Sequence, residues 1–331
     1  MYKWIIRLII VILLGVFARG IYLLSPSTSL KRYQTYFQPD NTDSLQQNEV
    51  AVTFFGNTTL LFDDGQTQIL IDPFVTRPDL WQVYAHKIQS DTHLVNRIIH
   101  TYKIKRLKGI FTSHSHYDHV FDVAQFARKT GATVYGTPST LNVARGGNIE
   151  NDQLQEYTPD NIVSIGKFTV TVLPSVHSKP TRYNNDLGEE ISTSLRQPAR
   201  YTDFKEGGSH DFYICHDQLK ILIRASYNSI PNQLDSIRAD LLFLGITGLG
   251  KAAKEEQDSF YAETIGKVKP QTVIPIHWDD FFVPIEKKTK AIFHLADNVD
   301  KGFNYLIKRT EADSISFMLM DKFQRFIIRP R

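Results

Sequence analysis

Four potential metal ligands stand within six consecutive residues of this chain, and this cluster constrains the possible fold more than any other feature. The segment from Ser113 to His119 reads Ser-His-Ser-His-Tyr-Asp-His. His114 and His116 are two residues apart, so in an extended turn both imidazoles can point the same way. Asp118 and His119 can then serve a second position nearby. A purely structural role would require partners for all these polar groups. We therefore predict two adjacent metal positions.

The cluster lies at a predicted junction between a strand and a helix. Residues 107–112 form a short apolar run typical of a buried strand. After the cluster, apolar residues recur every three to four positions from Val120 to Ala127, and Gly131 is a good helix terminator. Such a junction presents the side chains of its loop at the end of a sheet.

The rest of the chain mixes short strands with helices. Residues 50–55, 59–62 and 67–71 predict three antiparallel strands, and Asp64-Gly65 predicts the turn between the last two. Further strands are expected at 168–173, 212–215, 220–223, 241–244 and 273–276, and helices at 80–102, 255–268 and 285–296. No internal repeat is present. This alternation predicts one α/β domain after an N-terminal segment.

The complete His-x-His-x-Asp-His loop resembles the metal loop of the metallo-β-lactamase superfamily, which also lies between a strand and a helix. Asp72, at the end of Ile-Leu-Ile-Asp-Pro, resembles the acidic residue that supports this loop in the family. The resemblance covers roughly residues 49–278 and implies a four-layer αββα sandwich of two mixed β-sheets, with the site at one sheet edge. The branch it most resembles contains ascorbate-6-phosphate lactonase and N-acyl-phosphatidylethanolamine-hydrolysing phospholipase D.

Two distant histidines complete the ligand set that the resemblance implies. His177 in Val-His-Ser resembles the third histidine of the first metal position, and His277 in Ile-Pro-Ile-His-Trp resembles the last histidine of the second. The implied metal ligands are His114, His116 and His177 for one ion and Asp118, His119 and His277 for the other. Zn²⁺ suits these ligands, as do Mn²⁺ and Fe²⁺.

The chemistry implied is hydrolysis of an ester, lactone or phosphodiester by a metal-bound hydroxide. Asp118 would orient this nucleophile and pass a proton to the leaving group. The substrate is a small molecule or a lipid. A membrane-associated phospholipid hydrolase is an alternative, resting on the branch resemblance and the N-terminal segment.

One departure from the family pattern bears on activity. The family places a bridging Asp at the end of a strand where this chain has Ser226. A neutral hydroxyl is a far poorer ligand than a carboxylate, so the second metal position should be weakened most. The chain is then a one-metal enzyme, a non-catalytic metal-binding protein, or an enzyme in which Asn228 or a solvent molecule fills the gap.

The remaining histidines are weaker candidates. His86, His93 and His100 recur at seven-residue spacing, which favours a solvated helix face. His210 is a candidate for the substrate pocket, because loops at strand ends build this kind of site. Cys215 is the only cysteine, so an internal disulfide is excluded. Side chains alternate along a strand, so Cys215 and the next residue, His216, should lie on opposite faces, which argues against their binding one metal together. Residues 279–282 are candidates for the pocket rim.

The N-terminus predicts a membrane-directed segment. Lys3 and Arg7 precede an apolar run from Leu8 to Phe17, and small residues at 16 and 18 permit signal-peptidase cleavage after Ala18. Both a cleaved signal and a retained anchor are consistent with this pattern. We divide the chain into a membrane anchor or signal at 1–24, a linker at 25–48 and a catalytic domain at 49–331. We expect the catalytic domain to lie outside the cytoplasm, because the positively charged residues precede the apolar run.

Charge composition argues against nucleic acid as a partner. The 38 basic and 35 acidic residues are spread along the chain, and no basic block occurs.

Overall fold

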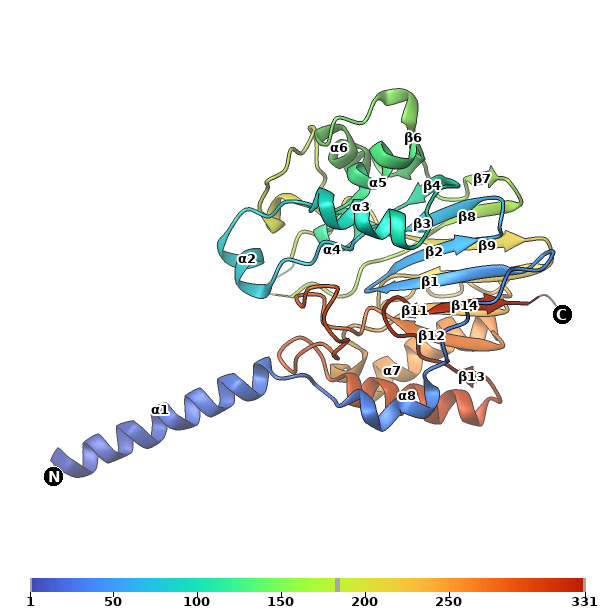
Figure 1. The fold of residues 1–331 in the computed structure, drawn as a ribbon. Helices are drawn as coiled ribbons and strands as arrows, with labels where there is room; N and C mark the ends of the chain where they lie inside the picture. The colour runs from blue at the N-terminus through green and yellow to red at the C-terminus, as the bar shows by residue number, and fades with distance from the viewer. Residues whose placement is uncertain (1, 182–184, 330–331) are drawn as a thin grey trace.

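Two mixed β-sheets pack face to face, with helices on both outer faces (Figure 1). The computed structural model describes residues 2–181 and 185–329. Each sheet has seven strands, and each combines an antiparallel half with a parallel half. The four-layer α/β sandwich expected from the sequence is therefore confirmed.

The first sheet has the order β14-β1-β2-β3-β4-β5-β6. Its strands are β1 (Val50–Gly56), β2 (Thr59–Asp63), β3 (Gln68–Ile71), β4 (Leu107–Phe111), β5 (Thr133–Gly136), β6 (Leu154–Glu156) and β14 (Arg325–Ile328). The predicted three-strand meander β1-β2-β3 is antiparallel, and the carboxylate of Asp64 accepts hydrogen bonds from the backbone N–H groups of Gln66 and Thr67 in its turn. Strands β3 to β6 are parallel.

The second sheet has the order β13-β12-β11-β10-β9-β8-β7. Its strands are β7 (Ile162–Ile165), β8 (Phe168–Pro174), β9 (His210–His216), β10 (Leu219–Arg224), β11 (Leu241–Gly245), β12 (Thr272–Ile276) and β13 (Ser316–Phe317). Strands β10 to β13 are parallel, and β7 to β10 are antiparallel. The strands predicted from 168 to 276 all form.

Alternation along the strands divides the apolar side chains among three core layers. Phe54, Ile69 and Phe212 belong to the layer between the sheets. The outer face of the first sheet packs on one set of helices and the outer face of the second sheet on another. The helices are α2 (Leu80–Ala85), α3 (Thr92–Thr101), α4 (Tyr117–Val120), α5 (Val123–Thr130), α6 (Pro138–Gly146), α7 (Lys254–Tyr261), which continues as the π-helix η5 (Ala262–Gly266), and α8 (Val299–Ala312); the 3₁₀ turns are η1 (Leu30–Tyr36), η2 (Asn151–Gln153), η3 (Tyr201–Asp203) and η4 (Leu249–Lys251).

Two helix predictions need correction. The helix expected at 285–296 is wrong, because residues 291–293 are consecutively buried and this segment is extended. Residues 290–292 pair with residues 278–280, and Phe293 pairs with Pro26. The helix of this region is α8, and the side chain of Asn298 caps its first turn. The helix expected at 80–102 is interrupted, because the Asp91 carboxylate accepts hydrogen bonds from the backbone of His93 and Leu94 and begins α3 anew.

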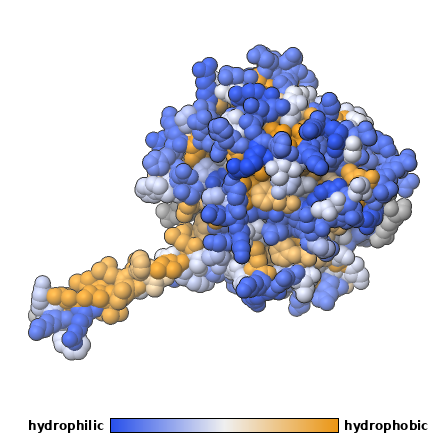
Figure 2. Space-filling view, in the orientation of Figure 1, coloured by the Kyte–Doolittle hydropathy of each residue, from blue (hydrophilic) through white to orange (hydrophobic). Residues whose placement is uncertain are grey.

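The N-terminal helix α1 (Tyr2–Leu24) extends away from the body as a straight rod (Figure 1). Its 23 residues have a mean hydropathy of 2.3 in the most apolar window, and none of that window is buried. Figure 2 shows its apolar surface open to solvent along its length. Length and composition permit the helix to cross a membrane or to serve as an export signal.

Residues 25–48, expected to act as a linker, contain η1 and contact the body. Tyr33 is 3% exposed, and its hydroxyl donates a hydrogen bond of 2.8 Å to Asp300 on α8. The domain boundaries themselves stay a prediction.

Candidate metal centre

The six predicted ligands meet at one edge of the sandwich, where strands from both sheets end. The loop after β4 and the short helix α4 carry the four clustered residues, while His177 follows β8 and His277 follows β12. They form two groups, His114, His116 and His177 in one and Asp118, His119 and His277 in the other. Within each group the potential ligand atoms lie within 4.8 Å of one another. The grouping matches the two positions that the resemblance implies.

The two groups adjoin each other, and the histidines where they meet are shielded from solvent. The ring centroids of His114 and His119, one from each group, are 3.8 Å apart, and both residues are 1% exposed. In the first group, the His177 ring lies 4.8 Å from the rings of His114 and His116. Five imidazoles and a carboxylate packed this closely leave ring nitrogens facing one another, which is unfavourable unless a cation lies between them.

Each of the five histidines has one ring nitrogen next to an oxygen atom outside the two ligand groups, which leaves its other nitrogen to face the ligands of its own group. The oxygen neighbours are Ser113 Oγ at 3.2 Å from His114 Nδ1, Asp186 Oδ1 at 3.1 Å from His116 Nε2, Asp72 Oδ2 at 2.8 Å from His119 Nδ1, the Ser178 carbonyl at 2.9 Å from His177 Nδ1, and Thr247 Oγ1 at 3.0 Å from His277 Nδ1. Histidines that bind metals almost always have such an oxygen partner. His114 Nε2 is buried and has no hydrogen-bond partner among the described residues. The donor set therefore fits a divalent metal.

Electrostatics keep Asp118 ionised and polarise His119. Burial opposes the charge of Asp118, but His119 and His277 outweigh it and hold the pKa of this carboxyl well below its usual range. Its Oδ2 atom lies 3.4 Å from His119 Nε2 and 3.3 Å from His277 Nε2. Burial lowers the pKa of His119, yet Asp118 and Asp72 together raise it to about 10. The second ligand group therefore attracts positive charge, either as protons or as a metal cation.

Two histidines of the first group, His114 and His177, attract protons poorly. Burial, together with the neighbouring histidines, lowers the pKa of His114 well below its usual range. Burial and the neighbouring His116 lower the pKa of His177 to about 4. Neutral imidazoles are the form that binds a metal, so these residues need not lose a proton to bind one at neutral pH.

Asp72 supports the metal loop, as expected. Its side chain is fully buried at the end of β3. One carboxylate oxygen accepts a hydrogen bond of 2.6 Å from the Ser113 backbone, and the other accepts bonds of 2.8 Å from the Ser113 hydroxyl and from His119. Asp72 therefore fixes both the start of the loop and the orientation of one candidate ligand.

The turn between β1 and β2 supports the loop from the other side. The Asn57 amide donates a hydrogen bond of 2.6 Å to the Asp118 carbonyl, and the Asn57 backbone donates to Asp279. Asp279 is fully buried and pairs with the buried Arg77 at 2.8 Å, so it does not line the rim. A Cβ atom at Gly56 would lie 2.2 Å from the Arg77 guanidinium, and only glycine leaves room for this pair.

Ser226 follows β10 and is 6% exposed. The Asn228 amide donates a hydrogen bond of 2.7 Å to the His177 carbonyl, while its side-chain oxygen accepts one from the Ser229 backbone. Asn228 thus fastens the segment that carries His177, and its oxygen is already engaged.

The other sequence candidates lie outside both ligand groups. His86, His93 and His100 are exposed, as the solvated-face interpretation expects. His210, at the start of β9, packs its ring against the Tyr157 ring, and its Nδ1 atom is buried without a partner among the described residues. His216 is buried while Cys215 is half-buried on the opposite face of β9.

An aromatic side chain does reach the site from residues 279–282. The Phe281 ring lies 5.6 Å from the His277 ring and 4.6 Å from the Phe282 ring. Burial raises the pKa of the nearby Asp280 carboxyl.

Known proteins match both the metal loop and the fold. Residues 67–204 match the family model described as the β-lactamase superfamily domain, a range that contains Asp72, the metal loop and His177 but not His277. A metallo hydrolase from Ignicoccus hospitalis, Igni18, superposes with a TM-score of 0.55 at 14% identity, covering 86% of this chain and all of that one. The chain has the metallo-β-lactamase fold.

Its sequence relatives include proteins named UPF0173 metal-dependent hydrolases. The one from Carboxydothermus hydrogenoformans is 25% identical over 236 residues, which is 70% of this chain and 85% of that protein. The one from Heliobacterium modesticaldum is 39% identical over 83 residues, 25% of this chain and 28% of that protein. These matches support the metallo-β-lactamase assignment. The resemblance to the lactonase and phospholipase D branch stays a prediction.

Proposed function

We propose that this protein is a metal-dependent hydrolase whose metal site is formed by His114, His116 and His177 together with Asp118, His119 and His277. The observation that carries the proposal is the arrangement of the five imidazoles, each with one nitrogen next to an oxygen atom and the other left for a metal. The names of its relatives agree with hydrolysis. The metal is zinc in our proposal, with manganese or iron as alternatives that the same ligands suit.

When bound, a divalent metal of this kind lowers the pKa of a bound water to about 7 and polarises a substrate oxygen. The chain supplies the positioning. Asp118 stays ionised at neutral pH, so its carboxylate can bind a cation or orient a water molecule. It can also accept a proton from that water and then pass the same proton to a leaving group. We propose Asp118 as the catalytic residue on this basis.

Ester, lactone and phosphodiester bonds are the substrate classes that this chemistry serves. Phe281 presents an apolar surface beside His277, which suits an organic substituent of the substrate. The apolar α1 helix supports the proposal that the protein is held at a membrane or exported, with its catalytic domain outside the cytoplasm. The narrower form of this proposal is that the substrate is a lipid.

Ser226 favours a second candidate function, a metal-binding protein without turnover. The second ligand group contains one carboxylate, that of Asp118, and no carboxylate stands at the end of β10. A single negative charge holds a dication less firmly than two do. Under this alternative the first metal position fills and the second does not.

Substitution of Ser226 by Asp distinguishes the two candidates. Metal content and hydrolysis of short soluble esters should be measured on wild type and on Ser226→Asp, with Ser229→Asp as a control for added charge outside the ligand groups. An active wild type that loses hydrolysis in Ser226→Asp supports an enzyme adapted to serine. An inactive wild type whose Ser226→Asp variant gains both metal and hydrolysis supports the non-catalytic candidate and refutes the proposed activity.

A further inference from the structure

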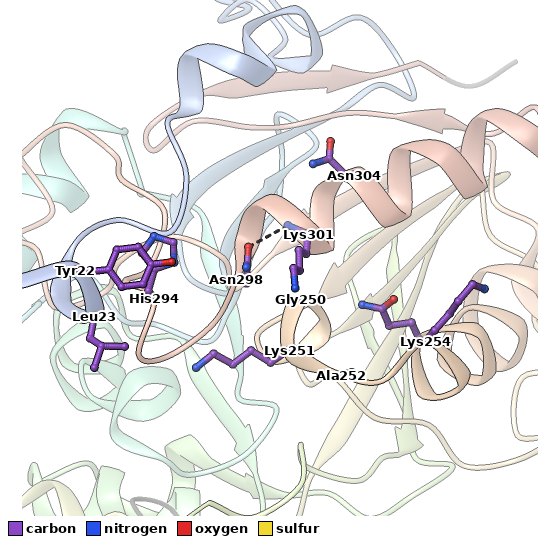
Figure 3. Close-up of a pocket in the computed structure, with 11 residues that line it drawn as sticks. Tyr22, Leu23, Gly250, Lys251, Ala252, Lys254, His294, Asn298, Lys301 and Asn304 are labelled. Atoms are coloured by element: carbon purple, nitrogen blue, oxygen red, sulfur yellow. Dashed lines mark hydrogen bonds between the residues drawn. The ribbon is translucent and has the colours of Figure 1, made fainter. Parts of the chain in front are cut away.

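A cavity lined by none of the six candidate metal ligands lies where the apolar helix α1 joins the body (Figure 3). Its volume is about 640 Å³. The lining comes from the last turn of α1, from η4 and the start of α7, and from the start of α8 with the segment before it. None of its eleven lining residues is acidic, whereas three are lysines: Lys251, Lys254 and Lys301.

The wall formed by α1 is fixed to the body. The Tyr22 ring stacks on the His294 ring with centroids 4.3 Å apart (Figure 3). The Leu295 backbone donates a hydrogen bond of 2.8 Å to the Leu23 carbonyl, and the His294 backbone donates one of 3.1 Å to the Ser25 carbonyl. The cavity therefore keeps a constant position relative to the end of the apolar helix.

The opposite wall is equally well defined. A Cβ atom at Gly250 would lie 1.8 Å from the Asn298 carbonyl oxygen, so η4 and the start of α8 are in close backbone contact. The Lys251 ammonium donates a hydrogen bond of 2.7 Å to the Leu295 carbonyl, which holds this side chain across the cavity.

The cavity carries uncompensated positive charge. Lys254 pairs with Asp258 at 2.6 Å. Lys251 acts electrostatically on the buried Asp297 carboxylate, but neither Lys251 nor Lys301 forms an ion pair among the described residues. The carboxylate nearest to Lys301 in the sequence, Asp300, is bonded to Arg32. Lys251 and Lys301 can therefore contribute positive charge to the binding of an anion in this cavity, whose lining contains no carboxylate.

The place of the cavity indicates which anion it meets. A helix of 23 residues is long enough to cross the hydrocarbon core of a bilayer, about 30 Å thick. The end of such a helix lies at the level of the lipid head groups, where tyrosine is enriched, and Tyr22 stands in its last turn. The lysines beside Tyr22 then lie at the height of the lipid phosphates.

We propose that this cavity binds the phosphate group of an anionic lipid head group next to the anchoring helix. The inference rests on the proposed membrane anchoring, but it needs neither a bound metal nor hydrolysis. The lipid would be a fixed ligand of the body, held by Lys251 and Lys301.

Lipid retention by the full-length chain in detergent tests this proposal. The protein is mixed with equal amounts of phosphatidylglycerol and phosphatidylcholine, and bound lipids are counted by native mass spectrometry. The variant is Lys251→Gln/Lys301→Gln, and the charge-matched control is Lys105→Gln/Lys129→Gln, two exposed lysines that line no part of the cavity. A lysine near an anionic head group contributes about fivefold in affinity.

We expect wild type and control to retain phosphatidylglycerol in preference to phosphatidylcholine, and the cavity variant to lose roughly twentyfold of that preference. Equal retention of the two lipids by wild type, or unchanged preference in a cavity variant with a wild-type melting temperature, would overturn the proposal. Displacement of the lipid by inorganic phosphate at comparable concentration would also overturn it, because the site would then serve a soluble anion. Metal content is measured on the same samples, so that failure of the lipid-binding proposal can be told apart from failure of the proposed hydrolase function.

Discussion

Replacement of Asp72 by Asn tests how the metal loop is held in place. The buried Asp72 carboxylate accepts three hydrogen bonds, two from Ser113 and one from His119 Nδ1. An asparagine keeps one oxygen, which can still accept the bond from the Ser113 backbone. Its amide group, however, would face the N–H of His119 with another donor, so that bond is lost.

The expected loss follows from these contacts. A hydrogen bond to a charged group contributes about 1.5–3 kcal/mol, so the free energy of unfolding of the metal-free protein should fall by about 2 kcal/mol. Metal affinity should fall by about 10- to 100-fold, because His119 loses the group that orients its ring.

Competition with a chromophoric chelator measures the metal affinity, and urea unfolding measures the stability. Asp122→Asn is a matched control, since Asp122 is equally buried and accepts hydrogen bonds of 2.7 Å from the Val75 and Thr76 backbones, but it touches none of the candidate ligands. The control should lose stability while keeping its metal affinity within about twofold. An Asp72→Asn variant that also kept wild-type affinity would refute the reasoning.

Three further results are expected. Folded His177 takes up a proton only near pH 4, whereas the unfolded residue does so near its ordinary pKa of about 6.5, so the metal-free protein should lose stability, on the order of 3 kcal/mol, as pH falls through this range. His177→Gln should flatten this part of the pH profile of urea unfolding, and an unchanged profile would contradict the assignment. Asp279→Asn leaves Arg77 buried without its partner, so the free energy of unfolding should fall by about 3–5 kcal/mol, and a loss below 1 kcal/mol by urea unfolding would show that the pair is dispensable. His277→Gln should weaken only the second metal position, so a titration that still fills both positions would remove His277 from the ligand set.

Most of the strands, and the edge where the site lies, could be predicted from the sequence. Apolar runs between turn residues mark β1 to β4 and β8 to β12, because each strand buries side chains against a neighbouring layer. The density of the cluster alone marked its four residues as candidate ligands. His177 and His277 were predicted from the resemblance to the family, and each follows an apolar strand, as a site at the strand ends requires.

The partners of the ligands could not be predicted. Asp186 and Thr247 each contact a candidate ligand through a loop, and loops carry no periodic pattern. Asn57 lies 61 residues from Asp118, and a turn asparagine with a positive φ of 52° is ordinarily read as a turn residue alone. The fold brings these residues to the site, and only the three-dimensional contacts identify them.

The α8 helix was missed for a related reason. The segment 285–296 is rich in lysine and apolar residues and was predicted as a helix, but its buried residues are consecutive and pair with the strand-like segment after β12. Tertiary pairing outweighed local helix propensity there.

Metal content per chain, measured by elemental analysis after purification without added chelator, tests the central claim most directly. Wild type should carry one to two divalent metals per chain, and His116→Ala should lose at least one, because it removes a ligand of the first position. A wild-type protein without metal, or a His116→Ala protein with undiminished metal, would contradict the claim that these histidines form a metal centre.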